Sequence, residues 1–427
     1  MSLPDTYYAR VASVEQPRPA LNGDCTFEVC IVGAGLAGLS TALELARRGR
    51  RVCVLEAQRV AWGASGRNGG FVSPGYSSSF PHIARRVGDE AARALHRLSI
   101  EGADAVAANL ASLNIRDAHR TTGILAVARH EATASLQAQR DWLERAFDYR
   151  LEFRSRAQVQ AVLSSPRYFQ GLYNPHGFHM QPLNYARALA QEIERLGGRV
   201  FEATRATALA ARPAVRVVST AGGQVRCQHI VIACGGYSDA LVPELKSSFL
   251  PIATYVMLTV ANKALIERAI RTSAAIGDHR RAGDYYRLVE GGERILWGGR
   301  ITTRTSEPNR LARLLHRTMV STYPQLQPLR VELAWSGLMA YARHLMPQIG
   351  RLREGLWYCT AFGGHGLNTT AIGGRVLAEA IAGESDRYRQ FEPFGLRWNG
   401  GVAGRMAVQA SYWSLQALDW LREPRAG

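Results

Sequence analysis

Three glycines, Gly33, Gly35 and Gly38, form the pattern G-x-G-x-x-G directly after an apolar run at residues 27–32. Between a strand and a helix, the first glycine allows a tight turn, the second lets the backbone approach a pyrophosphate, and the third allows close helix–strand packing. The helix would then present free N–H groups and a positive dipole end to the phosphates. The motif therefore supplies six candidate nucleotide-binding residues: Gly33, Ala34, Gly35, Leu36, Ala37 and Gly38.

An acidic residue stands where such a unit needs one. Glu56 ends the second apolar run, residues 51–56, and lies 18 residues after Gly38. A carboxylate there, with Ala57 beside it, can accept hydrogen bonds from ribose hydroxyls. A glycine-rich turn followed by a surface glutamate is the alternative. Because strand, helix and acid occur in the right order, we predict a dinucleotide-binding βαβ unit at residues 29–56.

A second glycine-rich segment, GASGRNGG at residues 63–70, follows seven residues after Glu56. Four glycines in eight residues let the backbone lie against a flat ring or a phosphate. FAD is long and needs contacts well beyond its adenosine end, so the segment favours FAD over a smaller nucleotide. A flexible surface loop is the alternative. The candidate cofactor residues here are Ala64, Ser65, Arg67, Asn68, Gly69 and Gly70.

A third segment, FGGHGLNTT at residues 362–370, stands between a predicted strand and a predicted helix at residues 370–382. We expect Asn368, Thr369 or Thr370 to cap that helix. Its N-terminus would suit the negative charge that reduced flavin carries around N1 and the C2 carbonyl. For His365, a proton-transfer role and a backbone-satisfied histidine beside a turn both stay open. The candidate cofactor residues are Gly363, Gly364, His365, Gly366, Leu367, Asn368 and Thr369.

The elements that must position these segments fall into separated blocks. Alternating strand patterns at residues 255–260, 284–289 and 295–301 interrupt the βαβ pattern. We therefore predict an α/β chain with a discontinuous Rossmann-like FAD-binding domain, residues 25–80, 181–246 and 336–427. Residues 81–180 and 247–335 would form a second, mixed α+β substrate domain. Turns after strands of the first domain add three cofactor candidates: Ala206, Gly235 and Gly337.

Composition narrows the class of protein. The chain has 427 residues and a formal net charge of +17, and all but Lys246 and Lys263 of its 52 basic residues are arginines. These arginines are scattered, which favours a solvated surface, although an anionic substrate or an RNA contact stays open. The six cysteines form no CxxC pair and no metal-ligand spacing, so we expect no metal site. No secretory signal and no stretch of about 18 apolar residues is visible, so we expect a cytoplasmic protein without a membrane span.

These segments resemble the D-amino-acid oxidase superfamily of flavoproteins. The resemblance rests on CIVGAGLAGLSTALELARRGRRVCVLEA, GASGRNGG and WYCTAFGGHGLNTTAIGGRVLAEAI, and GFHMQPLNYARALAQEIERLGGRVFE and DYYRLVEGGERILWGGR extend it over nearly the whole chain. Within the superfamily it is closest to the branch that oxidises gamma-glutamylputrescine. The resemblance implies oxidation of a C–N bond by hydride transfer to flavin N5. The resulting imine would hydrolyse to an aldehyde or keto acid and ammonia or an amine.

On the substrate side, the candidates are less constrained. Alternation places Leu296, Gly298 and Arg300 on one strand face, with Tyr285, Tyr286 and Arg287 on a neighbouring strand. Arg300 and Tyr286 facing the flavin would hold a substrate carboxylate, and with His365 they are the catalytic candidates. Ordinary sheet-face or surface positions are the alternative. Some superfamily members bind flavin through a cysteine. Cys359 lies within a predicted strand, so we expect non-covalent FAD.

Several functions fit these observations. The first is oxidation of a polyamine-derived or amino-acid-like amine, and the nearest alternative is a D-amino-acid, glycine or sarcosine-type oxidase or dehydrogenase. A flavoenzyme acting on an RNA-borne amine, although no nucleic-acid partner is expected, and a non-catalytic FAD-binding module are further alternatives. Oxygen and a quinone are both candidate electron acceptors. An amphipathic helix at residues 406–421, with Trp413 and Trp420, leaves open packing on the body or peripheral membrane contact.

Overall fold

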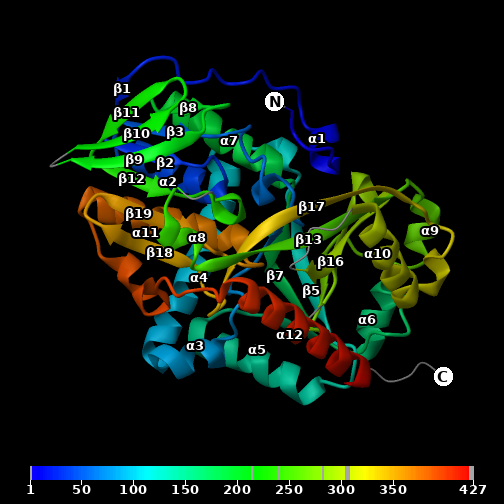
Figure 1. The fold of residues 1–427 in the computed structure, drawn as a ribbon. Helices are drawn as coiled ribbons and strands as arrows, with labels where there is room; N and C mark the ends of the chain where they lie inside the picture. The colour runs from blue at the N-terminus through cyan, green and yellow to red at the C-terminus, as the bar shows by residue number, and fades with distance from the viewer. Residues whose placement is uncertain (1, 213–214, 239–240, 281–282, 303–307, 423–427) are drawn as a thin grey trace.

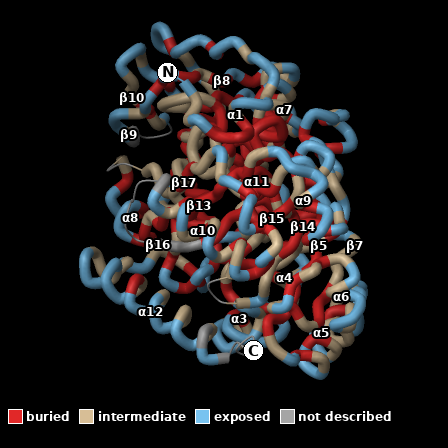
Figure 2. Tube along the Cα trace, turned by 90° about the vertical axis from the view of Figure 1, so that its right-hand side faces the viewer, coloured by how far each residue is buried: buried red, intermediate tan, exposed pale blue. Residues whose placement is uncertain are grey.

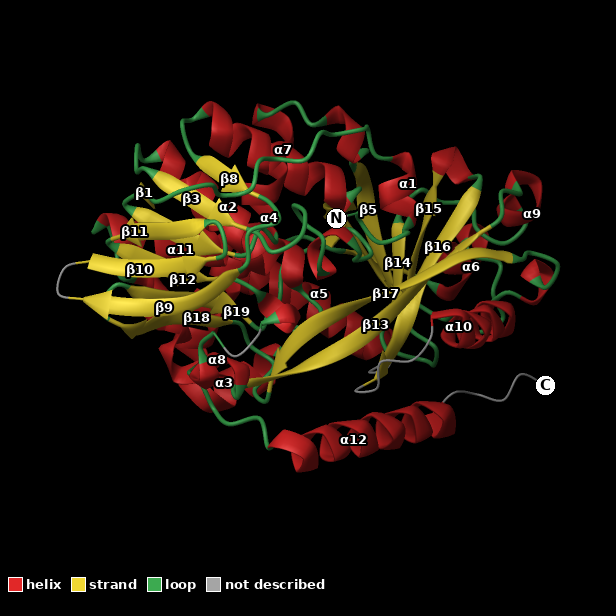
Figure 3. Cartoon of the chain, turned by 45° about the horizontal axis from the view of Figure 1, so that its top comes forward, coloured by secondary structure: helices red, strands yellow, loops and turns green. Residues whose placement is uncertain are grey.

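The computed structural model of the chain describes residues 2–212, 215–238, 241–280, 283–302 and 308–422. Three β-sheets and the helices around them make up the fold (Figure 1). Two of the sheets and a layer of helices stack at one end of the molecule. The third, largest sheet forms the other end (Figure 3). This confirms the predicted mixed α/β fold with a Rossmann-like parallel sheet.

The central sheet has six strands in the order β18-β19-β12-β2-β3-β8. All neighbours are parallel except β18, which runs antiparallel to β19. Every residue of β2 and β3 is buried because both faces of the sheet are covered. The strands are β2 (Val29–Val32), β3 (Val52–Leu55), β8 (Arg199–Phe201), β12 (His229–Ile232), β18 (Gln348–Arg353) and β19 (Leu356–Thr360).

Alternate residues of these strands serve two different cores. Val29 and Ile31 face a layer of helices: α2 (Leu36–Arg47), α4 (Asp89–Ser112), α7 (Pro182–Arg195) and α11 (Gly366–Ala382). Cys30 and Val32 point the other way. There they meet a four-stranded sheet made of β1 (Cys25–Thr26), β11 (Gly223–Cys227), β10 (Val215–Thr220) and β9 (Ala206–Arg212). The period-2 alternation of a strand thus builds a three-layer unit.

The third sheet runs in the order β17-β13-β16-β15-β14-β5-β7-β4, with β6 paired to β7. All of its pairs are antiparallel except β14 with β5. A separate core of buried aromatic and aliphatic side chains lies between this sheet and α10 (Pro308–Thr322). The strands are β4 (Phe71–Val72), β5 (Thr121–Val127), β6 (Glu152–Arg154), β7 (Gly171–His179), β13 (Phe249–Thr259), β14 (Ala275–Asp278), β15 (Tyr285–Val289), β16 (Arg294–Thr302) and β17 (Val331–Ala342).

The remaining helices lie around the edges: α1 (Tyr7–Val11), α3 (Phe80–Val87), α5 (Thr133–Phe147), α6 (Arg156–Val162), α8 (Pro243–Lys246), α9 (Lys263–Glu267) and α12 (Gly401–Arg422). Buried segments run through the middle of the molecule, whereas α12 lies largely exposed at one side (Figure 2). β4 and β17 belong to the third sheet although they begin or end inside the predicted FAD-binding blocks. The domain boundaries themselves stay a prediction.

Candidate active site

A cavity of about 1050 Å³ lies between the central sheet and the third sheet. At one end it is lined by the carboxyl ends of β2, β3 and β12 and by the two glycine-rich loops of residues 33–38 and 63–70, here called the glycine-loop end. At the other it is lined by Thr254, Tyr285 and residues 338–341 of the third sheet, here called the third-sheet end. The crevice beyond the carboxyl ends of parallel strands is where open α/β sheets bind ligands.

The first glycine motif forms the predicted turn between β2 and α2. Gly33 has φ of +109°, and a Cβ there would stand 2.9 Å from the carbonyl oxygen of Ala233. A Cβ on Gly38 would stand 1.9 Å from the carbonyl oxygen of Gly33, so this glycine lets the helix pack against the turn. Gly33, Gly35, Leu36 and Ala37 line the cavity, whereas Ala34 and Gly38 lie behind it. Because the first N–H groups of a helix have no partners within it, α2 directs donors and a positive dipole end here.

Glu56 is held rigidly at the end of β3. Its Oε2 accepts the Ala34 N–H at 2.8 Å and its Oε1 accepts the Gln58 N–H at 2.8 Å. Burial raises the pKa of the Glu56 carboxyl, and the two backbone N–H donors oppose that rise. Glu56 and Ala57 line the cavity, and each carboxylate oxygen keeps a lone pair for a further donor. The arrangement suits the two hydroxyls of a ribose.

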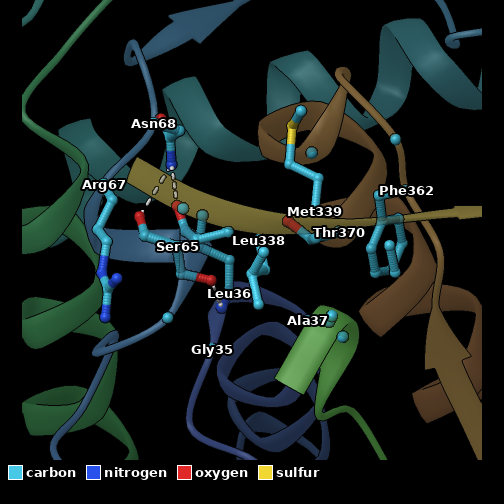
Figure 4. Close-up of a pocket in the computed structure, with 18 of the residues that line it drawn as sticks. Gly35, Leu36, Ala37, Ser65, Arg67, Asn68, Leu338, Met339, Phe362 and Thr370 are labelled. Carbon is cyan, nitrogen blue, oxygen red and sulfur yellow. Dashed lines mark hydrogen bonds between the residues drawn. The ribbon is translucent and has the colours of Figure 1, made fainter. Parts of the chain in front are cut away.

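The second glycine-rich segment is an ordered part of the wall. Its Ser65 Oγ accepts the Leu36 N–H at 2.9 Å, which joins the two loops. The Asn68 side chain donates to the carbonyl oxygens of Ala64 and Ser65 (Figure 4). Gly69 and Gly70 are buried, and a Cβ on Gly70 would stand 2.0 Å from the carbonyl oxygen of Met180. The flexible-loop alternative is therefore wrong. All six predicted residues, Ala64, Ser65, Arg67, Asn68, Gly69 and Gly70, line the cavity.

Arg67 carries a donor that the protein leaves unused. Its Nε donates to the Trp62 carbonyl at 2.8 Å and its Nη1 to the Ser336 carbonyl at 3.1 Å, while the guanidinium lies over the Trp62 ring. Nη2 is buried without a hydrogen-bond partner, and burial lowers the pKa of the guanidinium. A buried, unpaired guanidinium nitrogen in a cavity wall fits a bound group that supplies an acceptor.

At the third segment, the structure corrects the predicted helix start. α11 begins at Gly366 with His365 as its N-cap, so Asn368, Thr369 and Thr370 lie inside the helix rather than capping it. Asn368 instead donates to the Gly75 carbonyl at 3.1 Å. The Gly364 N–H donates to Ser77 Oγ at 2.8 Å. The first turn of α11 therefore opens toward the cavity, giving it a second helix N-terminus. The cavity is lined here by Gly363, Gly364, His365, Gly366, Leu367 and Asn368, whereas Thr369 does not line it.

The predicted substrate-binding residues differ most from what the structure shows. Tyr286 lies in the core beneath the third sheet, stacks on Trp297 at 4.1 Å and hydrogen-bonds Tyr168 and Tyr323. It does not line the cavity, and Tyr285 does, because neighbouring residues of a strand face opposite sides. Arg300 belongs to β16, but its side chain falls outside the described residues. His365 lines the cavity, and burial lowers the pKa of its imidazole.

An ionic cluster at the third-sheet end was not predicted from the sequence. Asp278 and Asp284 are buried, line the cavity and pair with Arg129 and Arg280. Burial and the neighbouring Asp278 charge raise the pKa of Asp284 to about 6, while the arginines oppose that rise. These residues lie 149 positions or more from Arg129 along the chain, so no local pattern brings them together.

An apolar wall stands next to the N-terminus of α11. Tyr341 bridges to Phe362, and the Gly363 N–H donates to the Ala340 carbonyl at 3.1 Å. Met339 and Phe362 lie together on the opposite side of the pocket from Ser65 and Asn68 (Figure 4). The wall, as named here, consists of Leu338, Met339, Tyr341, Leu345 and Phe362. It was not predicted, because β17 shows no glycine cluster or charged motif at these residues.

The other predicted cofactor residues, Ala206, Gly235 and Gly337, line the cavity as well. Cys359 does not. It is buried against α11, where a Cβ on Gly373 would stand 3.0 Å from its sulfur, and non-covalent flavin remains a prediction. Over the described ranges, no group of three or more His, Cys, Asp or Glu side chains could hold a metal ion. Nor does any helix within those ranges have the length and apolarity to cross a membrane.

This fold and cavity define the class of flavin-dependent oxidoreductases built on a Rossmann-like unit. Residues 28–380 match the model of the DAO family, FAD dependent oxidoreductase, and the chain belongs to that family. FAD is therefore its cofactor, and amines or amino acids are its substrates. The unpaired Arg67 nitrogen, Glu56 and the two helix N-termini fit FAD, and the cavity continues from Glu56 to Tyr341 of the third sheet.

Relatives and solved structures match this chain over most of its length. It is 33% identical to gamma-glutamylputrescine oxidoreductase of Escherichia coli (strain K12), over 96% of this chain and 97% of that protein. It is 28% identical to D-amino acid dehydrogenase 2 of Pseudomonas aeruginosa, over 88% of this chain and 99% of the other. Among solved structures, glycine oxidase from Geobacillus kaustophilus shares the fold, with a TM-score of 0.74, 20% identity and coverage of 87% and 98%. The predicted family resemblance is thus confirmed.

Proposed function

We propose that the protein oxidises a primary amine at the end of an extended, polyamine-type substrate such as gamma-glutamylputrescine. The apolar wall beside the N-terminus of α11 carries the proposal. An amino acid oxidised at its α-carbon needs a cation to hold its adjacent carboxylate. A methylene chain next to the reacting carbon needs an apolar surface instead, and the wall offers one.

The arginines at the cavity support this choice. Arg67 is fixed by two carbonyl oxygens at the glycine-loop end. Arg280 is paired with Asp278 and Asp284. Arg205 lines the glycine-loop end of the cavity, where its charge acts on Glu56. Among the described lining residues, no arginine therefore stands at the apolar wall. The identity to gamma-glutamylputrescine oxidoreductase over nearly the full length supports the same substrate class.

Bound FAD supplies the acceptor for a hydride from the carbon that carries the amine. The chain's own residues prepare the substrate. Met339 and Phe362 would hold the methylenes and exclude water, and a dry wall favours the neutral amine that the reaction requires. Because burial lowers the pKa of His365, its imidazole favours the neutral form and would accept a hydrogen bond from the entering amine rather than hold a proton.

Anaerobic flavin reduction tests the proposal. Holoprotein is mixed with gamma-glutamylputrescine, putrescine, glycine, sarcosine and a set of D-amino acids, and the flavin absorbance is followed. The proposal predicts that gamma-glutamylputrescine or a related polyamine derivative reduces the flavin fastest. Faster reduction by glycine, sarcosine or a D-amino acid would assign the chain to the amino-acid-oxidising alternative. Reduction by none of them would contradict the proposed substrate class.

A further inference from the structure

The C-terminal helix α12 turns its apolar side outward. Apart from Arg405, the exposed residues of its described part are apolar or serine: Val402, Ala403, Met406, Ala407, Ala410, Ser411, Trp413, Ser414, Ala417, Leu418 and Leu421. Each of these is exposed, with 69% exposure at Met406 and 55% at Trp413. A helix on a protein surface normally shows the opposite pattern, with polar residues outward. A contiguous exposed apolar face of this kind marks a surface that binds another protein or a membrane.

Polar residues of α12 explain why the helix keeps this orientation. Gln409 is buried and Tyr412 and Asp419 are half-buried on the inner side. Tyr412 approaches the cavity-lining Tyr341, and Asp419 acts on His279 next to the Asp278 cluster. At the other end, Asn399 anchors the helix by donating to the Phe249 carbonyl and accepting the Gly401 N–H. The inner side combines these polar groups with the half-buried Val408 and Leu415, while most apolar residues of the helix are left outside.

Figure 3 shows α12 lying along one side of the body, below β13 in this view, and the helix contacts β16. Trp398, in the segment that precedes α12, is a further large apolar side chain with 70% exposure. Arg397 and Arg405 are exposed at the border of this surface, and the Arg397 charge acts on the neighbouring Arg86. Within described residues 397–422, the only carboxylate is Asp419 on the inner side. The surface is therefore apolar at its centre and basic at its edge.

The net charge of the chain indicates which partner fits this surface. The chain has a net charge of +17, so two copies facing each other would bring like charges together. An anionic lipid surface attracts the same charge and accepts tryptophan, methionine and leucine side chains between its headgroups. A helix lying in the plane of the headgroups also needs no membrane span, and none of the described helices could form one.

We propose that the outer face of α12, with Trp398 and the bordering Arg397 and Arg405, docks the protein on a bilayer of anionic phospholipids. The apolar side chains would enter the region between the headgroups, while the arginines would contact lipid phosphates. Tyr412, on the inner side of the same helix, approaches Tyr341, which lines the flavin cavity. This role does not depend on which amine the enzyme oxidises.

Vesicle binding by the full-length holoprotein tests the proposal. Cosedimentation and tryptophan emission are measured with vesicles of phosphatidylglycerol mixed into phosphatidylcholine, and with phosphatidylcholine alone. We expect binding to the anionic vesicles, a shift of tryptophan emission to shorter wavelength, and binding weakened about tenfold or more by high salt. Absence of binding to the anionic vesicles at low salt would overturn the proposal.

Two sets of substitutions locate the surface. Met406→Glu with Leu418→Glu should reduce vesicle affinity about tenfold or more, and Arg397→Gln with Arg405→Gln should reduce it several-fold and flatten its salt dependence. Val14→Glu is the matched control, since Val14 is 97% exposed and lies in the N-terminal segment away from α12. The flavin absorbance and the thermal unfolding of each variant confirm that it is folded.

Undiminished binding by the Met406→Glu, Leu418→Glu variant would show that α12 is not the docking surface. Light scattering of the same samples tests whether a second copy of the chain covers this face instead of lipid. A dimer of the wild-type holoprotein that dissociates on these two substitutions would mean that a second copy covers the face, and it would overturn the lipid assignment.

Discussion

The two ends of the flavin cavity are built in different ways. At the glycine-loop end, close backbone approaches at glycines of two short segments set the shape: Gly38 to Gly33, Gly33 to Ala233 and Gly70 to Met180. At the third-sheet end, side chains from β13, β15 and β17 form the surface, as with Tyr285 and Met339. The first arrangement tolerates few residue types, whereas the second can change its ligand by exchanging side chains on a constant sheet. Cofactor binding and substrate choice are therefore separable, and four changes test that separation.

A methyl group at Gly38 is expected to have the largest effect. Gly38→Ala would place Cβ 1.9 Å from the Gly33 carbonyl oxygen and force the turn and α2 apart. We expect loss of FAD and destabilisation by about 3 kcal/mol or more. The matched change at the third-sheet end is Gly277→Ala, where no atom lies within 4 Å of the new methyl group. The flavin-to-protein ratio and thermal unfolding measure both. Equal FAD retention by the two variants would remove the contrast between the ends.

Met339→Arg tests the apolar wall. An unpaired guanidinium in the wall is costly to bury and would repel a cationic substrate. We expect flavin reduction by gamma-glutamylputrescine to slow roughly 100-fold, with FAD content unchanged. Val14→Arg places the same side chain at a position that is 97% exposed and should leave the rate unaltered. An unchanged rate in the Met339→Arg variant would show that the wall does not contact the substrate.

Asp284 should make stability depend on pH. Its pKa is raised from 3.8 to about 6, so the folded protein holds a proton that the unfolded chain releases between these values. The wild type therefore loses stability as pH rises from about 4 to about 6, and Asp284→Asn removes that loss. We expect the difference between the two proteins in free energy of unfolding to shift by on the order of 1–3 kcal/mol in favour of the variant over this pH range. Urea unfolding at several pH values measures it, and a constant difference would contradict the raised pKa.

Tyr286→Phe should have the smallest effect and separate the two neighbouring tyrosines. The variant loses hydroxyl contacts with Tyr168 and Tyr323 in the core, which are worth about 1–2 kcal/mol together. Stability should fall by that amount, while the rate of flavin reduction stays at the wild-type value. If Tyr286→Phe slowed flavin reduction without lowering stability, the original catalytic assignment would regain support. Tyr285→Phe, on the cavity side, is the companion variant.

Prediction from the sequence succeeded where a function depends on neighbouring residues. Gly33, Glu56 and, in the second loop, Ala64, Ser65 and residues 67–70 line the cavity, while Ala34 and Gly38 support it from behind. Their contacts with the cofactor stay a prediction. The start of α11 was misplaced because a side-chain cap was expected at Asn368, Thr369 or Thr370, whereas His365 is the N-cap without a side-chain bond. Tyr286 was misplaced because alternation defines two faces of a strand without saying which one meets the cofactor.

The amino-acid sequence by itself determined the glycine-loop end, the order of strands and helices around it, and thus an FAD-binding βαβ unit. The glycine spacing within each segment marks where the backbone must come close, so these positions can be read from the sequence. The partners Ala233 of Gly33 and Met180 of Gly70 lie far along the chain and are given by the fold. Only the tertiary structure decided the third-sheet end: Tyr285 over Tyr286, the Asp278–Asp284 cluster with Arg129, and the apolar wall on β17. These groups meet through sheet pairing across long stretches of chain, which no local pattern specifies. The outward apolar face of α12 became visible for the same reason, since amphipathicity alone does not say which side of a helix faces the body.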